Sequence, residues 1–446
     1  MKYFVCILGF ITFLYSYGMA DSYPLGDTKD NLQTYQNPLP SSVIQDFRDI
    51  IEQNPKIKQL QLEINSLENR KKAQSKWNNP SFNLAYNSAN IQKPLLLGTS
   101  DMQNIAFGLS QSIDLNLKSL AQSKVTNVEI EIKILELKNL KNEYMLNLMV
   151  SMIESHKNKL ILESIKQSLG NLETIFTSLK KSKKFNPIQA QKLKVAEARL
   201  KIKQNQIENA LNNSHIAISE IDFHKAPQQD YKTDTKHNSH LIDTKYDLFL
   251  FPSKEAQDII MHNTQNDDFI PSLLAQNLEL QIARHKIVLA EQKLVFAKKS
   301  TLPNFGMNLV YMSRADRSDL FGLGVSVPLP IYGKEQRTIA EAREQKLAQE
   351  YGYLSVENKL THSTKTLLKK FLLLKKNLSV IEENLLPANT AIIDLYKHHS
   401  TSQAEGFIEF YNALNEKIDT QILQIQILSE IAMIYWNLQI LKGEIL

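Results

Sequence analysis

The chain carries the same arrangement twice: two short alternating segments followed by a very long helical pattern. The segments cover residues 81–86 and 105–113 in the first half, and residues 304–311 and 321–329 in the second half. Apolar residues alternate in them with small or polar residues, which is the period-two pattern of a β-strand. Because a repeat of this length dictates the architecture, each half is expected to contribute two strands flanked by long helices.

The helical patterns have a period of 3.5 residues. Near the end of the second half, apolar residues recur at alternating steps of three and four, at Phe371, Leu374, Leu378, Ile381, Leu385, Ala388, Ile392 and Leu395. This spacing predicts a coiled-coil seam, and Pro387 is expected to kink or break that helix locally. The helical stretches run from about residue 118 to 180 and from about 335 to 398, or about 90 Å each. Such rods reach across a compartment.

Each alternating segment has the length of a transmembrane β-strand, about 9–11 residues. The residues predicted to face lipid in the second half are Phe305, Leu309, Phe321, Leu323, Val325 and Val327. A small soluble antiparallel sheet covered by the helices is the alternative. Four strands cannot close a barrel, and lipid does not tolerate an open sheet edge, so membrane insertion requires several copies. A trimer would supply twelve strands, an even number within the bacterial range.

The N-terminus predicts a secretory signal peptide over residues 1–20, cleaved after Ala20. An uncleaved anchor helix is the alternative. Cys6, the only cysteine, lies in this segment, so the mature chain has neither disulfides nor thiolate chemistry. The predicted division of the rest is a linker (21–42), a first repeat (43–221, strands about 81–90 and 103–114), an inter-repeat segment (222–269) and a second repeat (270–446, strands about 304–313 and 320–330).

Motifs for catalysis are lacking: the sequence has no phosphate loop, HExxH pair, nucleophile elbow or paired-cysteine site. We therefore predict a protein that is not an enzyme and needs no cofactor. The histidines between the repeats are either solvated loop residues or a loose metal-sampling group, since they lack ligand spacing. The net charge of +5 comes from interspersed lysines and glutamates, so no nucleic-acid partner is expected.

Residues 321–343 resemble the second strand and following helix of the TolC-type outer-membrane efflux factors, with Pro328 and Pro330 at the corner between them. Residues 311–314, 386–388 and 436–443 resemble further sequence motifs of the same family. Taken together, the motifs are most similar to those of its heavy-metal cation branch. The resemblance runs from about Val43 to Gly443. It implies a mainly α fold with a small β part, in which a trimer forms a 12-stranded β-barrel and an α-helical periplasmic tunnel.

The resemblance also implies a function and partners. The chain would be the outer-membrane exit duct of a tripartite pump, working with a periplasmic adaptor (membrane fusion protein) and an inner-membrane, proton-driven RND-type pump. Heavy-metal cations are the expected cargo. Drug or small-molecule efflux, a type I secretion duct, and a coiled-coil scaffold or adaptor without a pore remain open as alternatives.

Two turns between helices are expected at the periplasmic mouth. By resemblance, the second turn places a pore constriction at Glu405, Glu409 and Asn412, although Asn412 is not acidic as in several relatives. These glutamates are equally well explained as first-turn residues favoured by the helix dipole. The first turn carries Lys180, Lys181, Lys183 and Lys184, which form either a docking patch for an adaptor or an ordinary solvated turn.

Overall fold

The computed structural model describes residues 41–88, 91, 92, 98, 100–114, 116–181, 187–221, 250–263, 268–315, 317–399 and 404–443. All of these residues belong to one compact unit, Pro38–Leu446. The predicted signal peptide lies outside the described residues, as do most of the predicted linker and most of the inter-repeat segment. Those assignments, and the boundaries of the predicted repeats, stay predictions.

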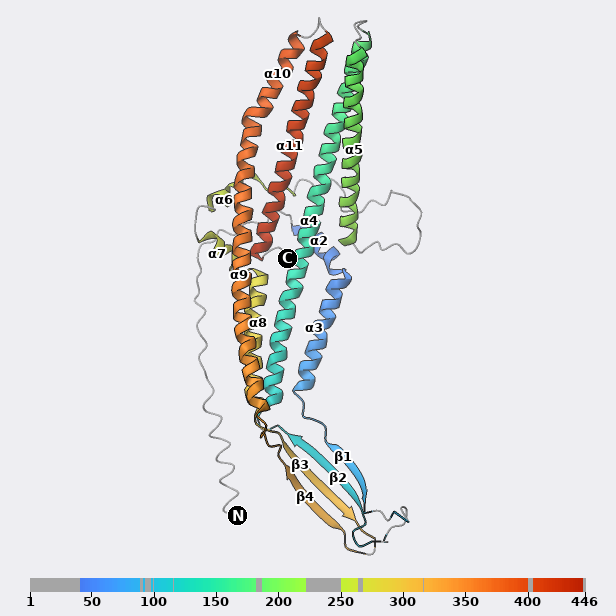
Figure 1. Cartoon of the computed structure of the whole chain (residues 1–446), viewed down its shortest axis with the longest axis vertical. Coiled ribbons are helices and arrows are strands. Elements are labelled where there is room, and N and C mark those ends of the chain that lie inside the picture. Colours follow the sequence, from blue (N-terminus) through green and yellow to red (C-terminus); the bar gives the residue numbers. More distant parts are fainter. Residues whose placement is uncertain are drawn as a thin grey trace. The chain divides into compact units, whose positions relative to one another are not determined.

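The two halves fold alike (Figure 1). In the first half the elements are α2 (Ser41–Glu52), α3 (Pro55–Gln74), β1 (Ser81–Asn87), β2 (Asn104–Ile113), α4 (Lys118–Lys181) and α5 (Pro187–Ile221). The second half has α6 (Lys254–Asn263), α7 (Phe269–Leu274), α8 (Leu278–Ser300), β3 (Phe305–Ser313), β4 (Leu320–Ser326), α9 (Lys334–Val380), the π-helical η4 (Ile381–Leu385), α10 (Leu386–His399) and α11 (Ala404–Lys442). The predicted repetition of two strands between long helices is confirmed.

Both hairpins join into one antiparallel sheet with the strand order β1-β2-β3-β4. The second strand of the first half pairs with the first strand of the second half, over nine residue pairs from Ile105–Ser313 to Ile113–Phe305. β4 ends at Ser326, earlier than predicted, because Pro328 has no N–H to donate to a ladder. Val327, predicted as a strand residue facing lipid, therefore lies just past the strand.

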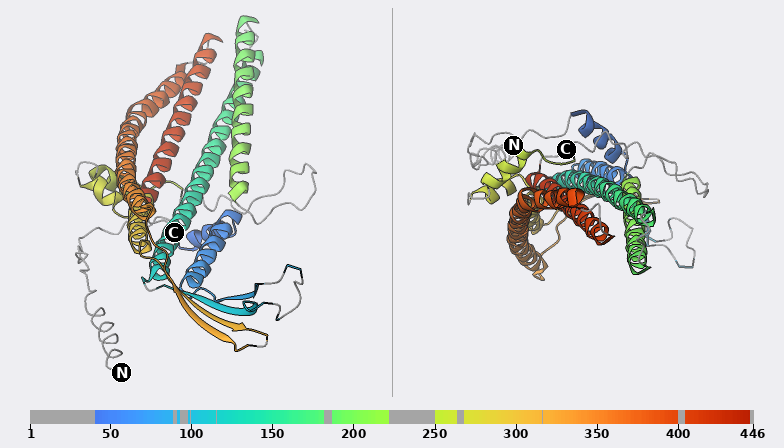
Figure 2. Two further views of the ribbon diagram at one scale, coloured as in Figure 1. Left: turned by 60° about the horizontal axis from the view of Figure 1, so that its bottom comes forward. Right: turned by 90° about the horizontal axis from the view of Figure 1, so that it is seen from above.

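The helices pack side by side in two layers that follow one another along the helix axes (Figure 2). α4 runs through both: its first half contacts α3 and α8, and its second half contacts α5 and α11. α9 does the same in the second repeat, contacting α8 and then α11. The resulting orders are α3-α4-α8-α9 next to the sheet and α5-α4-α11-α9/α10 beyond it. α4 alone has 64 residues, which corresponds to about 96 Å.

The predicted seam near Pro387 is correct only up to Ile381. Phe371, Leu374, Leu378 and Ile381 are buried, but Leu385, Ile392 and Leu395 are exposed, and Asn389 and Ile393 are buried instead. The cause is η4, in which the Leu386 N–H donates to the carbonyl of Ile381 five residues earlier. Pro387 cannot donate a helical hydrogen bond, and the π turn absorbs the defect while rotating the buried face by one residue.

A central core forms where the two layers meet. There the short helices α2, α6 and α7 pack on α4, α9 and α11, and Phe47, Phe371 and Trp436 are fully or almost fully buried. The indole Nε1 of Trp436 donates to the carbonyl of Leu250 at 3.0 Å, so the one polar atom of this side chain is satisfied.

Replacing Trp436 should destabilise the fold strongly. Its side chain is 1% exposed, so Trp436→Ala leaves a large cavity and an unpaired carbonyl, at a cost of about 3–5 kcal/mol in the free energy of unfolding. The matched control is Trp77→Ala, because Trp77 is 78% exposed. Thermal or denaturant unfolding of the two variants should separate them clearly; equal losses would contradict the position of this core.

Candidate functional site

One face of the four-stranded sheet is apolar from edge to edge. The pairing register sets eight large apolar side chains in two rows, Leu84-Phe107-Tyr311-Phe321 and Phe82-Leu109-Leu309-Leu323. The opposite face carries the rows Asn83-Gly108-Val310-Gly322 and Ser81-Ser110-Asn308-Gly324. In the single chain the apolar face is open, with Phe321 and Leu323 exposed by 67% and 66%. Five of the six residues predicted to face lipid share it; Val327 is the exception.

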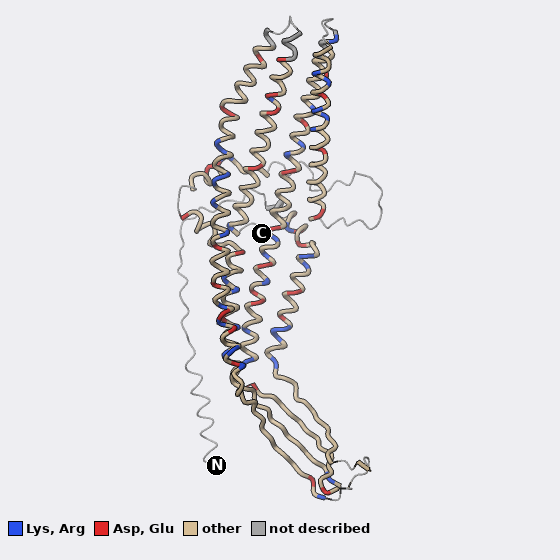
Figure 3. Tube along the Cα trace, in the orientation of Figure 1, with Lys and Arg blue, Asp and Glu red and all other residues tan. Residues whose placement is uncertain are grey.

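The strands carry no charged side chain (Figure 3). Charges return at both ends of the sheet. Beyond β2, Asp114 accepts hydrogen bonds from the backbone N–H and the hydroxyl of Ser119 in the first turn of α4, at 2.8 and 3.0 Å. Burial opposes ionisation of this carboxyl, but the hydrogen bonds from Ser119 and Lys118 outweigh burial and lower the pKa of Asp114. The apolar face is thus bounded by fixed charges at the start of α4.

The other end of the sheet is tied together by polar contacts between its loops. Arg317 forms an ion pair with Asp101 at 2.8 Å, which joins the β3–β4 turn to the β1–β2 connection. Asp319 accepts from the hydroxyl of Tyr311 and from the backbone N–H of Arg314. The two hairpins are therefore fastened to one another beyond their shared ladder.

The sheet has two free edges. Among the described strands, β1 pairs only with β2 and β4 pairs only with β3, so one side of each outer strand presents unpaired backbone N–H and C=O groups. In the part of the chain that the structure describes, no helix has both the length and the apolar character to cross a bilayer.

At the far end of the helices, α11 exposes a polar stripe. Its exposed residues follow steps of three and four: Glu409, Asn412, Glu416, Asp419, Leu423 and Gln426. Glu409 accepts a hydrogen bond from the hydroxyl of Tyr396 on α10 at 3.3 Å, and the charge of Glu409 raises the pKa of Tyr396. Two of the three predicted constriction residues, Glu409 and Asn412, therefore lie on one face. Glu405 belongs to α11, but its side chain is not among those that the structure describes.

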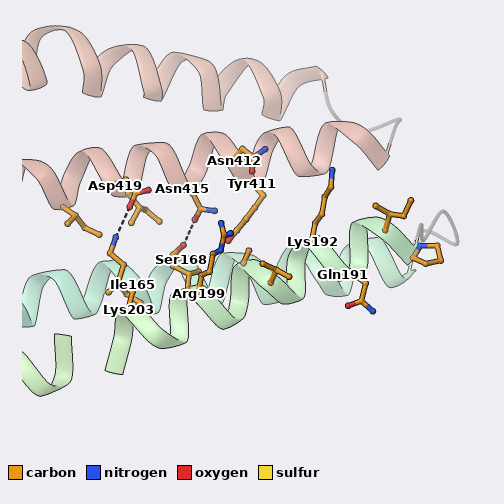
Figure 4. Close-up of a pocket in the computed structure, with 17 residues that line it drawn as sticks. Ile165, Ser168, Gln191, Lys192, Arg199, Lys203, Tyr411, Asn412, Asn415 and Asp419 are labelled. Carbon is orange, nitrogen blue, oxygen red and sulfur yellow. Dashed lines mark hydrogen bonds and ion pairs between the residues drawn. The ribbon is translucent and has the colours of Figure 1, made fainter. Parts of the chain in front are cut away.

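The adjoining side of α11 faces α4 and α5, so Asn412 and Asp419 of the stripe lie at its edge. Tyr411 is buried against Leu172, Ile175 and Leu193, and burial raises the pKa of its hydroxyl. A groove runs beside it, with α5 and α11 as walls and α4 as floor (Figure 4). Within it, Ser168 donates to the Asn415 side-chain carbonyl at 2.5 Å, and Lys203 pairs with Asp419 at 3.1 Å.

These groove contacts were not predicted from the sequence. The sequence signal for Asp419 is its place in the polar stripe of α11, which begins at Glu409 and continues in steps of three and four residues. The pairing of Asp419 with Lys203 depends instead on which helices are neighbours. Of the predicted docking patch, Lys180 is exposed at the end of α4 and Lys181 is helical; Lys183 and Lys184 lie outside the described residues. Among the described side chains, no three His, Cys, Asp or Glu gather as a metal site would require.

Comparison with known proteins gives a family match over part of the chain and a fold for nearly all of it. The model of the outer membrane efflux protein family matches residues 269–399, which contain α8, both strands of the second repeat, α9 and α10. No curated protein matches the chain by sequence.

Several solved structures share the fold at low identity. CusC superposes with a TM-score of 0.68 at 13% identity, covering 95% of this chain and 99% of that chain. The CmeC outer membrane channel of Campylobacter jejuni gives 0.67 at 11%, covering 90% and 85%. The outer membrane protein VceC of Vibrio cholerae gives 0.67 at 11%, covering 90% and 96%.

Proposed function

We propose that this chain, a TolC-type outer-membrane efflux factor in its family domain and its fold, acts as a homotrimer that forms the passive exit duct of a tripartite pump. It would sit in the outer membrane and extend into the periplasm. A periplasmic adaptor and an inner-membrane, proton-driven RND-type pump would supply the cargo. In this proposal the chain itself catalyses no reaction.

The observation that carries the proposal is the sheet: uncharged, largely apolar on one face and open at both edges. Such a face is stable in lipid, but the open edges are not, because each unpaired backbone group would cost several kcal/mol there. In an all-antiparallel sheet of four strands, β1 and β4 run in opposite directions. β4 of one copy can therefore pair antiparallel with β1 of the next, and three copies close a barrel of twelve strands.

The outer edges of the helical layer support the same closure. On α5 the residues Ile188, Val195, Ile202 and Ile216 keep heptad spacing and are more than half exposed, and the first two also line the groove beside Tyr411. On α10, at the opposite edge, Ile392 and Leu395 are exposed as well. Exposed apolar lines on the two edges of one layer suit packing between successive copies, in the manner of a coiled-coil seam.

Metal cations are the proposed cargo. This assignment is based on fewer observations than the assignment of the duct. The basis is the resemblance of residues 321–343 to the heavy-metal cation branch, with no metal ligand of this chain involved. Drug efflux and polypeptide secretion use the same duct, because the inner-membrane pump chooses the substrate. A periplasmic scaffold without a pore is the alternative that the apolar sheet face argues against.

Charge on the apolar face should block membrane assembly. Leu309→Arg places a cation in the middle of the sheet, at about 2–4 kcal/mol per copy if lipid covers that face. Asn308→Arg is the matched control, since it is the neighbouring residue on the opposite face. Heat-modifiable trimer in outer-membrane fractions should be lost for Leu309→Arg and retained for Asn308→Arg. Equal loss would refute the assignment of the faces.

Glu409 is the proposed pore constriction, because threefold repetition would set three carboxylates around one axis, where a narrow mouth magnifies their field. Glu409→Gln should reduce cation preference in planar-bilayer recordings and leave the trimer intact. Glu416→Gln is the control, a glutamate exposed on the same stripe two turns away. If selectivity falls only for Glu416→Gln, or for neither variant, Glu409 is a surface residue.

The cargo can be tested in cells that lack the gene. Deletion should sensitise them to zinc, cadmium, nickel, cobalt or copper salts, and a plasmid copy should restore growth. The Leu309→Arg plasmid is the control for duct function. Normal metal tolerance with raised sensitivity to dyes and detergents would replace metals by drugs as the cargo, and would leave the proposed duct standing.

A further inference from the structure

Basic residues concentrate where the helices meet the sheet (Figure 3). The helix ends and connections next to the sheet are residues 70–80, 114–124, 293–304 and 327–337. They contain eleven lysines and arginines but only two carboxylates, Asp114 and Glu335, for a net charge of +9. The whole chain carries +5, so the rest of it is net negative. We call the eleven basic residues the basic collar: Arg70, Lys71, Lys72, Lys76, Lys118, Lys124, Lys293, Lys298, Lys299, Lys334 and Arg337.

The collar differs from the rest of the helices in how its charges are paired. Away from the sheet, lysines commonly contact carboxylates on neighbouring helices, as Lys141 does with Glu52 at 2.9 Å. In the collar, Arg70 forms an ion pair with Glu129. Among the described residues, the other ten have no carboxylate within ion-pair distance, so a cluster of cations is left without an internal counter-charge.

Helix dipoles do not account for this cluster. Cations are favourable at the C-termini of α3 and α8, where Lys72 and Lys298 lie. They are unfavourable at N-termini, yet α4 begins at Lys118 and α9 at Lys334. Positive charge at both kinds of helix end indicates an external anionic surface at this level of the molecule.

Exposed apolar side chains occupy the same level. Trp77 follows α3 and is 78% exposed, and the segment after β4 exposes Leu329, Ile331 and Tyr332 by 73%, 70% and 92%. Aromatic residues with an apolar body and a polar tip are typical of the boundary between lipid and water. Lysines next to them can extend along the apolar surface and keep the ammonium group at headgroup depth.

We infer that the basic collar and its exposed aromatic residues bind anionic phospholipid headgroups of the leaflet that faces the helices. The inference rests on the proposed function, because it places the sheet in a membrane. The partner follows from charge complementarity: a surplus of unpaired cations beside an apolar, uncharged sheet fits a lipid surface that bears phosphate groups. Binding would fix the depth of the sheet in the bilayer.

Trp77 can report this binding in the assembled protein. The other tryptophan, Trp436, is 1% exposed, so quenching by contact with brominated lipid reaches Trp77 alone. The full chain is reconstituted in phosphatidylethanolamine vesicles with a minor share of phosphatidylglycerol, and bromine is placed on one lipid or on the other. We expect brominated phosphatidylglycerol to quench more than its share of the lipid predicts, and added salt to weaken this preference.

Neutralising the collar should remove the preference. The collar variant carries Lys72→Gln, Lys76→Gln, Lys298→Gln and Lys299→Gln, and each lysine that faces headgroups contributes about fivefold to association. The control variant makes the same change in charge at four exposed lysines away from the sheet, Lys194, Lys365, Lys369 and Lys376. It should keep the preference of the unmodified protein, and Trp77→Phe should abolish the quenching.

The outcomes separate the collar from the duct. Trimer migration and pore conductance are measured on the same preparations, and their loss in the unmodified protein would overturn the proposed function. If the trimer conducts but both brominated lipids quench in proportion to their share, the collar does not select anionic lipid. If neither lipid quenches Trp77 in the conducting trimer, a second copy of the chain covers this surface and the inference is wrong.

Discussion

The structure depends on a single constraint, which is that the backbone hydrogen bonds of a sheet must be satisfied in its surroundings. Four strands with two open edges and one largely apolar face suit neither water nor lipid as a single chain. Other features share this constraint: a sheet shared between the halves, an alternating pattern without charge, and helices whose outer edges carry apolar lines. In the single chain, both sheet edges and the apolar face stay open.

The long helix α4, and in the second half α9 continued by η4 and α10, connect the sheet to the far end without a break in the packing. Each runs through both layers, so the same rod that leaves the sheet also contacts α11, which carries Glu409 and its polar stripe. The ion pair between Lys203 and Asp419 and the bond between Ser168 and Asn415 hold α4, α5 and α11 together near that end. The position of the sheet and the position of the helix tips are thereby mechanically linked.

Much of the architecture could be predicted because the sequence pattern is periodic. The repeat, the four strands, the two long helices and the efflux-factor family follow from patterns of two and 3.5 residues and from the residues after Phe321, and the structure and the comparisons confirm them. The predicted seam was wrong beyond Ile381. The heptad pattern of the sequence continues through Pro387, but the backbone forms a π turn there and shifts the buried face. The groove beside Tyr411 was missed because it depends on the lateral order of helices, and periodicity does not encode that order.

The π turn before Pro387 also has a meaning for how such chains change over time. Buried positions resume at Asn389, eight residues after Ile381, where an unbroken seam would need seven. The chain thus accommodates a one-residue insertion inside a rod, where insertions are normally confined to loops. Homologues that differ in length by one residue at this point can keep both flanking faces in contact with α11. An alignment gap there would mark the absence of the π turn and not a lost turn of helix.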